Sequence, residues 1–300
     1  MFIIDTDTAG DDNTALLMAL RLGLDIKAIT INCGNIDFDQ QVDNALYTVE
    51  FSGVDAPVYA GMRETMGKSY RHVEEVHGKD GMGNSFFPKA KKRPERRHAV
   101  ETILDLINDN PGQVSIVELA PMTNLAMAVK LDRGITKKVK QLYFMGGSLG
   151  LNGNITPVAE FNFWVDPDAA KIVLESGIPM TMVDWDVTLK SATLDQARLL
   201  EIERLGTEWS RFFLGINRTV RKYMMDTEGR DAVTCPDTLT VAVALGLEVK
   251  KEMLHVDVDS SDGLCRGASV VDRKKEPNVN AVVEASLDSF YSMLLRALKS

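Results

Sequence analysis

Four aspartates lie within the first twelve residues of the chain, at Asp5, Asp7, Asp11 and Asp12. They fall between an apolar run at residues 2–4 and an apolar stretch at 14–22, which places them at a strand end, a tight loop and a helix start. The carboxyl ends of parallel strands are where ligands bind. Capping the helix needs one aspartate, whereas four crowded carboxylates repel one another unless a cation lies between them. Oxygen ligands favour Ca²⁺ or Mg²⁺ over zinc, so the cluster predicts a site for a hard divalent cation.

The same residues allow a second chemistry. The pattern Asp5-x-Asp7 is similar to the start of the haloacid-dehalogenase-like phosphatases, in which the first aspartate is the nucleophile and the second an acid or base. The aspartate cluster alone does not separate phosphate transfer from metal-assisted hydrolysis, and both hypotheses stand at this point.

Composition excludes several classes of protein. The 300 residues include 34 basic and 43 acidic side chains, a net charge of −9, which argues against binding to nucleic acid. The one strong basic run, at residues 89–97, is interpreted as a solvated loop. No apolar run reaches the roughly 18 residues of a membrane span, and residues 2–4 are too few for a signal-peptide core. We therefore expect a cytoplasmic protein without a membrane partner. The three cysteines are odd in number and widely spaced, so we expect no disulfide and no zinc site.

The apolar pattern predicts the elements that must position the aspartates. Short strands are expected at residues 2–5, 26–32, 58–60, 114–119, 139–145 and 180–185. Helices are expected between them, at residues 14–22, 40–51, 99–108, 125–131 and 169–175. This alternation predicts an α/β fold, with a mostly parallel, Rossmann-like central sheet flanked by helices. No linker or repeat interrupts residues 1–300, so we expect a single domain.

The last third of the chain reads differently. Helices are expected at residues 194–205, 208–225 and 238–247, followed by a hairpin of strands 255–259 and 268–272, a short strand and a final helix at 287–298. Two long segments rich in polar or aromatic residues, about 61–94 and 206–235, are predicted to be lids, because connections of that length in a compact domain are usually functional.

Seven short motifs follow the predicted strands in a fixed order. After Asp7-Thr-Ala-Gly-Asp11-Asp12 come Cys33-Gly34-Asn35, His77-Gly-x-x-Gly81-x-Gly83, Ala120-Pro121-Met122-Thr123-Asn124-Leu125, Met145-Gly146-Gly147, Asn154 with Ala159-Glu160-Phe161-Asn162-x-x-x-Asp166-Pro167, and Pro236-Asp237-x-Leu239. In this order and over almost the whole chain, the set resembles the inosine–uridine-preferring nucleoside hydrolases. The later motifs have no place in the phosphatase pattern, so the resemblance favours the hydrolase.

The resemblance implies a reaction and a set of roles. The reaction is hydrolysis of the N-glycosidic bond of a ribonucleoside, with water activated by Ca²⁺ and Asp7 as the general base. The implied calcium ligands are Asp7, Asp12, Asp237 and the main-chain carbonyl of Leu119. The implied contacts to the 2′- and 3′-hydroxyls of ribose are Asp11, Asn35, Asn162 and Asp237. Asn154 and Glu160 are implied at the 5′-hydroxyl, and Asp5 is expected to orient the loop. Family members are dimers or tetramers, which implies a homodimer or homotetramer here.

Each of these residues also has an ordinary structural explanation. Asn35 and Asn154 are good turn formers. Asp237 could be the N-cap of the helix predicted at 238–247. Glu160 and Asn162 could alternate across one face of a strand.

The chain departs from the family pattern at the leaving group. In the best-described branch of the family, a histidine directly precedes the last metal aspartate and protonates the departing base, whereas this chain has Pro236 there. Proline cannot donate a proton. His77, together with His72, lies in the first lid and is the candidate donor, while Cys235, Tyr223, Arg221 and Arg230 are further options. A smaller departure is Thr8-Ala9-Gly10, where the family has proline and glycine.

Three hypotheses therefore remain from the sequence. The chain is an active N-ribohydrolase with a rearranged leaving-group site, a ribose- or nucleoside-binding protein with little turnover, or a phosphatase. Base preference, purine or pyrimidine, depends on the two lids, where the resemblance is weakest.

Overall fold

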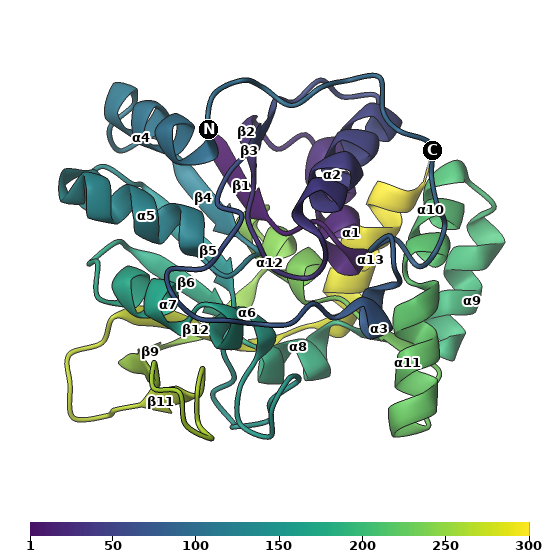
Figure 1. Cartoon of the computed structure of the whole chain (residues 1–300). Coiled ribbons are helices and arrows are strands. Elements are labelled where there is room, and N and C mark those ends of the chain that lie inside the picture. The colour runs from purple at the N-terminus through teal and green to yellow at the C-terminus, as the bar shows by residue number, and fades with distance from the viewer. Residues whose placement is uncertain (300) are drawn as a thin grey trace.

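A computed structural model describes residues 1–299 of the chain. Its centre is an eight-stranded sheet in the order β3-β2-β1-β4-β5-β6-β12-β9, in which only β9 runs antiparallel, against β12. The strands are β1 (Phe2–Thr6), β2 (Ile26–Ile31), β3 (Val58–Ala60), β4 (Ser115–Glu118), β5 (Gln141–Met145), β6 (Met180–Val183), β9 (Val249–Leu254) and β12 (Val279–Ala285). The predicted α/β fold with a mostly parallel sheet is confirmed (Figure 1).

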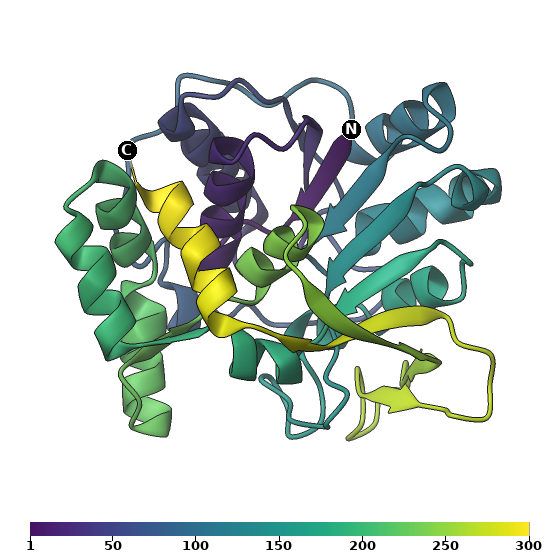
Figure 2. The same cartoon turned by 180° about the vertical axis from the view of Figure 1, so that it is seen from behind.

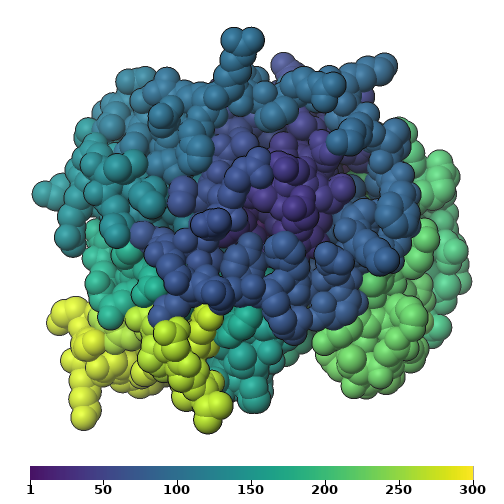
Figure 3. Space-filling model, viewed as in Figure 1, coloured from purple at the N-terminus to yellow at the C-terminus, as the bar shows by residue number. Residues whose placement is uncertain are grey.

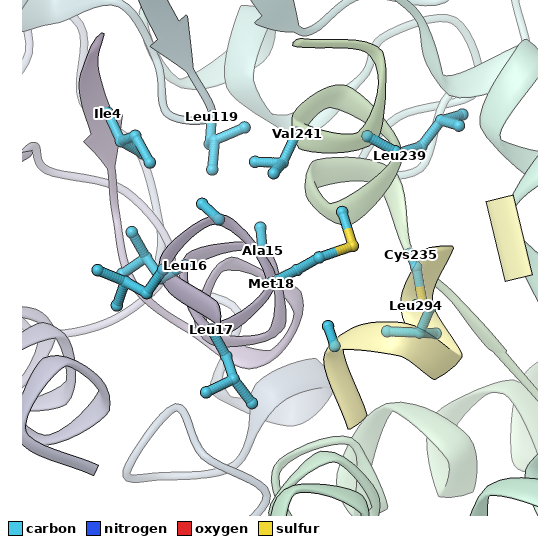
Figure 4. Close-up of a cluster of buried hydrophobic side chains, with 14 of the residues drawn as sticks. Ile4, Ala15, Leu16, Leu17, Met18, Leu119, Cys235, Leu239, Val241 and Leu294 are labelled. Atoms are coloured by element: carbon cyan, nitrogen blue, oxygen red, sulfur yellow. The ribbon is translucent and has the colours of Figure 1, made fainter. Parts of the chain in front are cut away.

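Helices cover both faces of this sheet because neighbouring strand residues point to opposite sides. Ile4 packs on one side with α1 (Gly10–Arg21), whereas Ile3 packs on the other with α5 (Thr123–Leu131). Figure 4 shows Ile4, Leu119 and Leu239 gathered around α1 in the first of these cores. The first side also holds α2 (Phe38–Ser52), α10 (Glu208–Ile216), α12 (Pro236–Ala244) and α13 (Leu287–Leu298), and the second holds α4 (Ala99–Asp109) and α7 (Pro167–Leu174) (Figure 2).

Further elements surround the carboxyl end of the sheet. They are α3 (Glu74–His77), α6 (Phe161–Val165), α8 (Trp185–Ser191), α9 (Gln196–Leu205), α11 (Arg218–Glu228), and the pair β7 (Thr193–Asp195) and β8 (Ala232–Thr234). The 3-10 helix Arg133–Lys137 lies at the opposite end of the sheet, shortly before β5 begins. The predicted hairpin is also present, as β10 (Val256–Val258) against β11 (Ser269–Val271). In residues 1–299 no helix has the length and apolar character that a membrane crossing requires.

In the last third of the chain two predicted helices differ from the structure, and one strand was not predicted. The helix expected at 208–225 is two helices, because the buried amide of Asn217 donates to the carbonyl of Phe213 and to Thr14 Oγ1 where α10 ends. The helix expected from 194 starts only at Gln196, where the side chain of Asp195 caps it. Strand β9 was missed because its charged residues obscure the strand pattern, a composition typical of an edge strand.

The order of the strands determines where a ligand can bind. The chain leaves β1 toward β2 on one side and later returns to β4 on the other, which makes the β1–β4 boundary a topological switch point. The first predicted lid, residues 61–94, runs across the front of the molecule near this boundary (Figure 1), and Figure 3 shows its blue surface around the purple N-terminal residues.

Candidate active site

A cavity of about 650 Å³ opens at the carboxyl ends of the central strands. Eight of the residues proposed from the sequence line it: Asp11, Asn35, His77, Leu119, Asn154, Glu160, Asn162 and Asp237. The other two, Asp7 and Asp12, are fully buried directly behind Asn35, to which both are hydrogen-bonded. The fold therefore brings all ten residues, from six distant segments, to one place.

Asp7 and Asp12 are held by the loop that follows β1. Thr6 Oγ1 donates to Asp12 Oδ1 at 2.6 Å, and the Asn35 amide N–H donates to Asp7 Oδ2 at 2.8 Å. The backbone at Gly34 can lie this close to the Asp7 carboxylate only without a side chain, since a Cβ there would lie 1.9 Å from Asp7 Oδ2. Asp7 Oδ1 is buried and has no hydrogen-bond partner among the described residues. An unpaired carboxylate oxygen without access to water is costly, so this atom is the clearest sign of a missing ligand.

The first turn of α12 is capped by Asp11 and not by Asp237. Helix α12 begins at Pro236, and the side chain that receives its first N–H groups is Asp11, from the N-terminal segment. Asp11 Oδ2 accepts from the amides of Asp237 and Thr238 at 2.8 and 3.0 Å. The interpretation of Asp237 as a plain N-cap is therefore wrong. Its carboxylate lines the cavity and receives no hydrogen bond from residues 1–299.

The start of α6 positions a second polar group. Glu160 is the N-cap of α6 and accepts from the amide of Asn162 at 2.8 Å, so the strand interpretation of this segment is wrong. The Asn162 side chain donates to the carbonyl of Leu119 at 2.9 Å. Asn154 Oδ1 accepts from the Phe161 amide at 2.8 Å and thereby holds its loop against the helix. These three contacts place oxygen and nitrogen atoms on one wall of the cavity.

The carboxylates are crowded without any compensating cation in the described chain. Burial is the main cause that raises the pKa of each, to about 6 for Asp11, about 7 for Asp12 and Glu160, and well above the ordinary range for Asp7 and Asp237. Repulsion from neighbouring carboxylates adds to the rise for Asp7 and Asp237. No lysine or arginine within residues 1–299 forms an ion pair with any of the five. Burying such groups is favourable only with a proton or a metal ion.

The metal-free protein is therefore expected to be more stable at about pH 5 than at about pH 7.5. The folded-state pKa of Asp12, about 7, lies above its ordinary 3.8, so its contribution is complete below pH 3.8 and is lost as the pH rises through 7. Asp11 and Glu160, whose pKa values are also raised, likewise lower the stability of the folded state as the pH rises. Buried His77, whose pKa falls to about 4, has the opposite effect, but it is one group against three. Thermal unfolding in EDTA at constant ionic strength measures this, and a melting temperature that rises between the two pH values would contradict it.

The other half of the cavity is largely apolar. The first-lid residue Val76 and the α11 residues Val220 and Met224 face it, as does Trp185 at the start of α8. Tyr223, Thr227, Glu228, Arg230 and Thr234 add polar groups at this end. A flat heterocycle has apolar faces and polar edges, which this mixture of side chains can accommodate.

His77 is the histidine that the fold brings to the cavity. Its ring packs against Gly10, where a Cβ would lie 2.5 Å from His77 Nδ1, and that nitrogen is buried without a partner in the described chain. Burial lowers the pKa of His77 to about 4, so the ring is neutral at pH 7. His98 caps α4, and His255 bonds to the carbonyl of Glu276 outside the cavity.

Two of the other suggested proton donors are excluded by their positions. Arg221 is bound through two nitrogens to Asp231, and it does not line the cavity. Cys235 is fully buried in the core around α1 (Figure 4), where burial raises the pKa of its thiol well above the ordinary range. Tyr223 and Arg230 line the cavity and remain candidates.

The anchoring of one segment of the site was not predicted. The loop at residues 146–160, between β5 and α6, covers the polar wall and carries Asn154. Two aspartates at the start of α8 hold it: Asp184 accepts from the Leu149 amide at 2.8 Å, and Asp186 from Ser148 Oγ at 2.6 Å. Gly146-Gly147 was identified as part of a motif and Asn154 as a turn former, but nothing in the sequence indicated that α8 would anchor this loop.

Comparison with known proteins places the chain in a family. The sequence profile of the family described as inosine-uridine preferring nucleoside hydrolase matches residues 2–292. The pyrimidine-specific ribonucleoside hydrolase RihB of Escherichia coli (strain SE11) is 28% identical over 298 residues, which cover 97% of this chain and 95% of the relative.

Two solved structures are similar over nearly their whole length. The plant nucleoside hydrolase PpNRh1 superposes with a TM-score of 0.93 at 29% identity, covering 100% of this chain and 98% of the other. The purine-preferring ribonucleoside hydrolase from Gardnerella vaginalis gives 0.89 at 28% identity, with 99% and 97% covered. With a family profile across almost the whole sequence and relatives that match it over nearly their whole length, the chain belongs to the inosine-uridine preferring nucleoside hydrolases and is a hydrolase of N-glycosyl bonds.

Proposed function

We propose that the protein hydrolyses the N-glycosidic bond of ribonucleosides in a calcium-dependent reaction and releases ribose and the free base. The observation that carries the proposal is the division of the cavity into a buried, acidic, amide-rich half and an apolar half. Loss of the base leaves positive charge on the ribose ring, and fixed carboxylate and amide oxygens stabilise that charge as it develops. The apolar half then receives the base.

The donor set fits a calcium ion. Asp7, Asp12, Asp237 and the carbonyl of Leu119 would hold it, all through oxygen, and the partnerless Asp7 Oδ1 offers an available ligand atom. Within residues 1–299 no three acidic, histidine or cysteine side chains are already drawn together around one point, so we expect the carboxylates to adjust on binding. When bound, the ion lowers the pKa of a water molecule and orients it toward the sugar.

The chain's own residues then complete the reaction. Asp7, with one unpaired oxygen, takes the proton of the attacking water. The 2′- and 3′-hydroxyls are held by Asp11, Asn35, Asn162 and Asp237. The 5′-hydroxyl is held by Asn154 and Glu160. Hydrogen bonding of this kind discriminates strongly against sugars that lack a hydroxyl.

His77 is proposed as the group that contacts the departing base. A neutral imidazole donates an N–H hydrogen bond, but at pH 7 it does not supply a proton as an imidazolium does. With Pro236 in the usual position of the acid, we expect fast hydrolysis only when the leaving group is stable without protonation. This observation also favours the second candidate function, a ribose- or nucleoside-binding protein with little turnover.

The phosphatase hypothesis has no support in the structure. Asp5, its required nucleophile, is fully buried, and its oxygens accept from the side chains of Asn124 and Asn32 at 2.7 and 3.2 Å. A carboxylate engaged in this way supports the neighbouring loops and is not exposed for attack on a substrate.

A reducing-sugar assay tests the proposal. The panel contains purine and pyrimidine nucleosides together with p-nitrophenyl riboside, whose leaving group needs no proton, each with calcium and after chelation. Ribose release from ordinary nucleosides supports the proposed hydrolase, and release from the activated riboside alone supports a working sugar site without an acid. No release of ribose from any substrate of the panel, with calcium bound, favours the ribose- or nucleoside-binding protein. Light scattering on the same sample tests the predicted homodimer or homotetramer.

A further inference from the structure

A single buried amide joins the first lid to the loop that carries the site aspartates. Asn44, in α2, is 2% exposed. Its Nδ2 donates one hydrogen to the carbonyl of Thr8 at 3.0 Å and the other to the carbonyl of Asp80 at 2.9 Å, while its Oδ1 accepts from Gln40 Nε2 at 2.9 Å. Thr8 belongs to the aspartate loop, residues 7–12. Asp80 belongs to a tight turn of the first lid, residues 78–86, which we call the Asp80 turn.

The Asp80 turn is held in an unfavourable backbone conformation. Asn84 and Phe86 have positive φ angles of 58° and 48°, values that cost free energy for residues other than glycine. The buried carboxylate of Asp80 offsets that cost, because it accepts from the amides of Met82 and Asn84 at 2.8 Å each and of Phe86 at 2.6 Å. Such strain persists only where the surroundings hold the segment in one arrangement.

The same turn contacts the aspartate loop at a second point. The Gly10 amide donates to the carbonyl of Gly81 at 2.7 Å, and the His77 ring lies against Gly10. The far side of the turn rests on α10, since a Cβ on Gly83 would lie 2.3 Å from the carbonyl oxygen of Gly215. The aspartate loop is therefore bonded to the lid on both sides of Ala9, once directly and once through Asn44.

We infer that Asn44 is a positioning residue that fixes the Asp80 turn and the aspartate loop to each other, and so sets the separation between His77 and Asp7. Asp7 directly precedes Thr8, and His77 lies three residues before Asp80. Release of the amide leaves the Gly10–Gly81 hydrogen bond as the remaining backbone link between the two segments within residues 1–299, so their separation is less firmly fixed. A displacement of about 1 Å in a reacting group lowers the rate by up to ~10²-fold.

The kinetic consequence rests on the proposed function and falls mainly on kcat. Asn154, Glu160 and Asn162 are held by α6, which Asn44 does not contact, so most of the sugar contacts survive its loss. We expect Asn44→Leu, which keeps the side-chain branching and removes both donors, to lower kcat by about 10- to 100-fold with a smaller change in KM.

Hydrogen–deuterium exchange tests the link without substrate. In Asn44→Leu, exchange is expected to accelerate in residues 7–12 and in residues 78–86 together. A matched control is Asn278→Leu: Asn278 Nδ2 also donates to two carbonyls, those of Leu174 and Val256 at 3.2 and 3.0 Å, away from the cavity. The control is expected to keep kcat within about twofold of the parent protein, whatever its melting temperature.

The inference is overturned when Asn44→Leu keeps kcat at the level of the control, or when exchange accelerates in only one of the two segments. If Asn44→Leu does not fold, Asp80→Asn replaces it, because an amide nitrogen in place of Oδ2 cannot accept from Phe86 and loosens the same turn. If the parent protein releases no ribose from any substrate, the proposed function fails, and the exchange measurement alone decides whether the link exists.

Discussion

Replacing Asp7 with asparagine is expected to lower kcat for ribose release by about 10³-fold or more while the fold is retained. Asparagine keeps an oxygen that can accept from the Asn35 amide, so the loop contact at 2.8 Å survives. It cannot take a proton from water, and a positioned general base contributes about 10²- to 10⁴-fold. It also removes a charge from the proposed calcium ligands, which adds to the loss. Single-turnover ribose release at saturating calcium measures the rate, and calorimetric titration measures calcium affinity.

The control for Asp7 is a second aspartate changed in the same way. Asp195 caps α9 through the Arg198 amide at 3.0 Å and is exposed to solvent. Asp195→Asn is expected to leave kcat and calcium binding unchanged. Asp7→Ala and Asp12→Ala are expected to abolish turnover and calcium binding together. Full activity in a calcium-free preparation of any Asp7 or Asp12 variant contradicts the metal-assisted mechanism.

The central sheet and the polar half of the site could be predicted from the sequence for one physical reason. The parallel strands are short β-branched runs, and polar residues follow directly after several of them. Since the carboxyl ends of those strands meet at one edge, residues as distant as Asp12, Asn35 and Leu119 had to lie near one another. The order of the motifs along the chain then added Asn162 and Asp237.

The supporting contacts could not be predicted, because they join segments with no local signal. In the sequence Asp11 has the appearance of an ordinary first-turn acid of α1, yet its carboxylate caps α12 by accepting from the Asp237 amide, 226 positions later. Asn44 reads as a polar residue on a helix face, yet it bonds to two loops at once. Long-range pairs of this kind depend on tertiary packing, which a single sequence does not display.

Pro236→His is expected to raise hydrolysis of unactivated purine nucleosides by about 10²-fold. Pro236 is the first residue of α12 and lines the cavity next to Asp237. The first N–H groups of a helix have no partner within it, so a histidine at this position costs the helix little. The neighbouring carboxylates of Asp11 and Asp237 favour a protonated ring, which can supply the acid that the site lacks.

Comparison of two substrates in two variants isolates the proton transfer. Pro236→Gln introduces a backbone N–H and a polar side chain but no acidic proton, so its rates are expected to resemble those of the parent protein. The p-nitrophenyl riboside needs no protonation, so its rate is expected to change little in either variant. A gain confined to Pro236→His and to ordinary nucleosides shows that the leaving-group acid limits the parent protein. Equal rates in both folded variants mean that another cavity residue already supplies the proton, and Tyr223 and Arg230 are the candidates that line the cavity. In that case the replacement of histidine by Pro236 reflects a rebuilt base site and not a lost function.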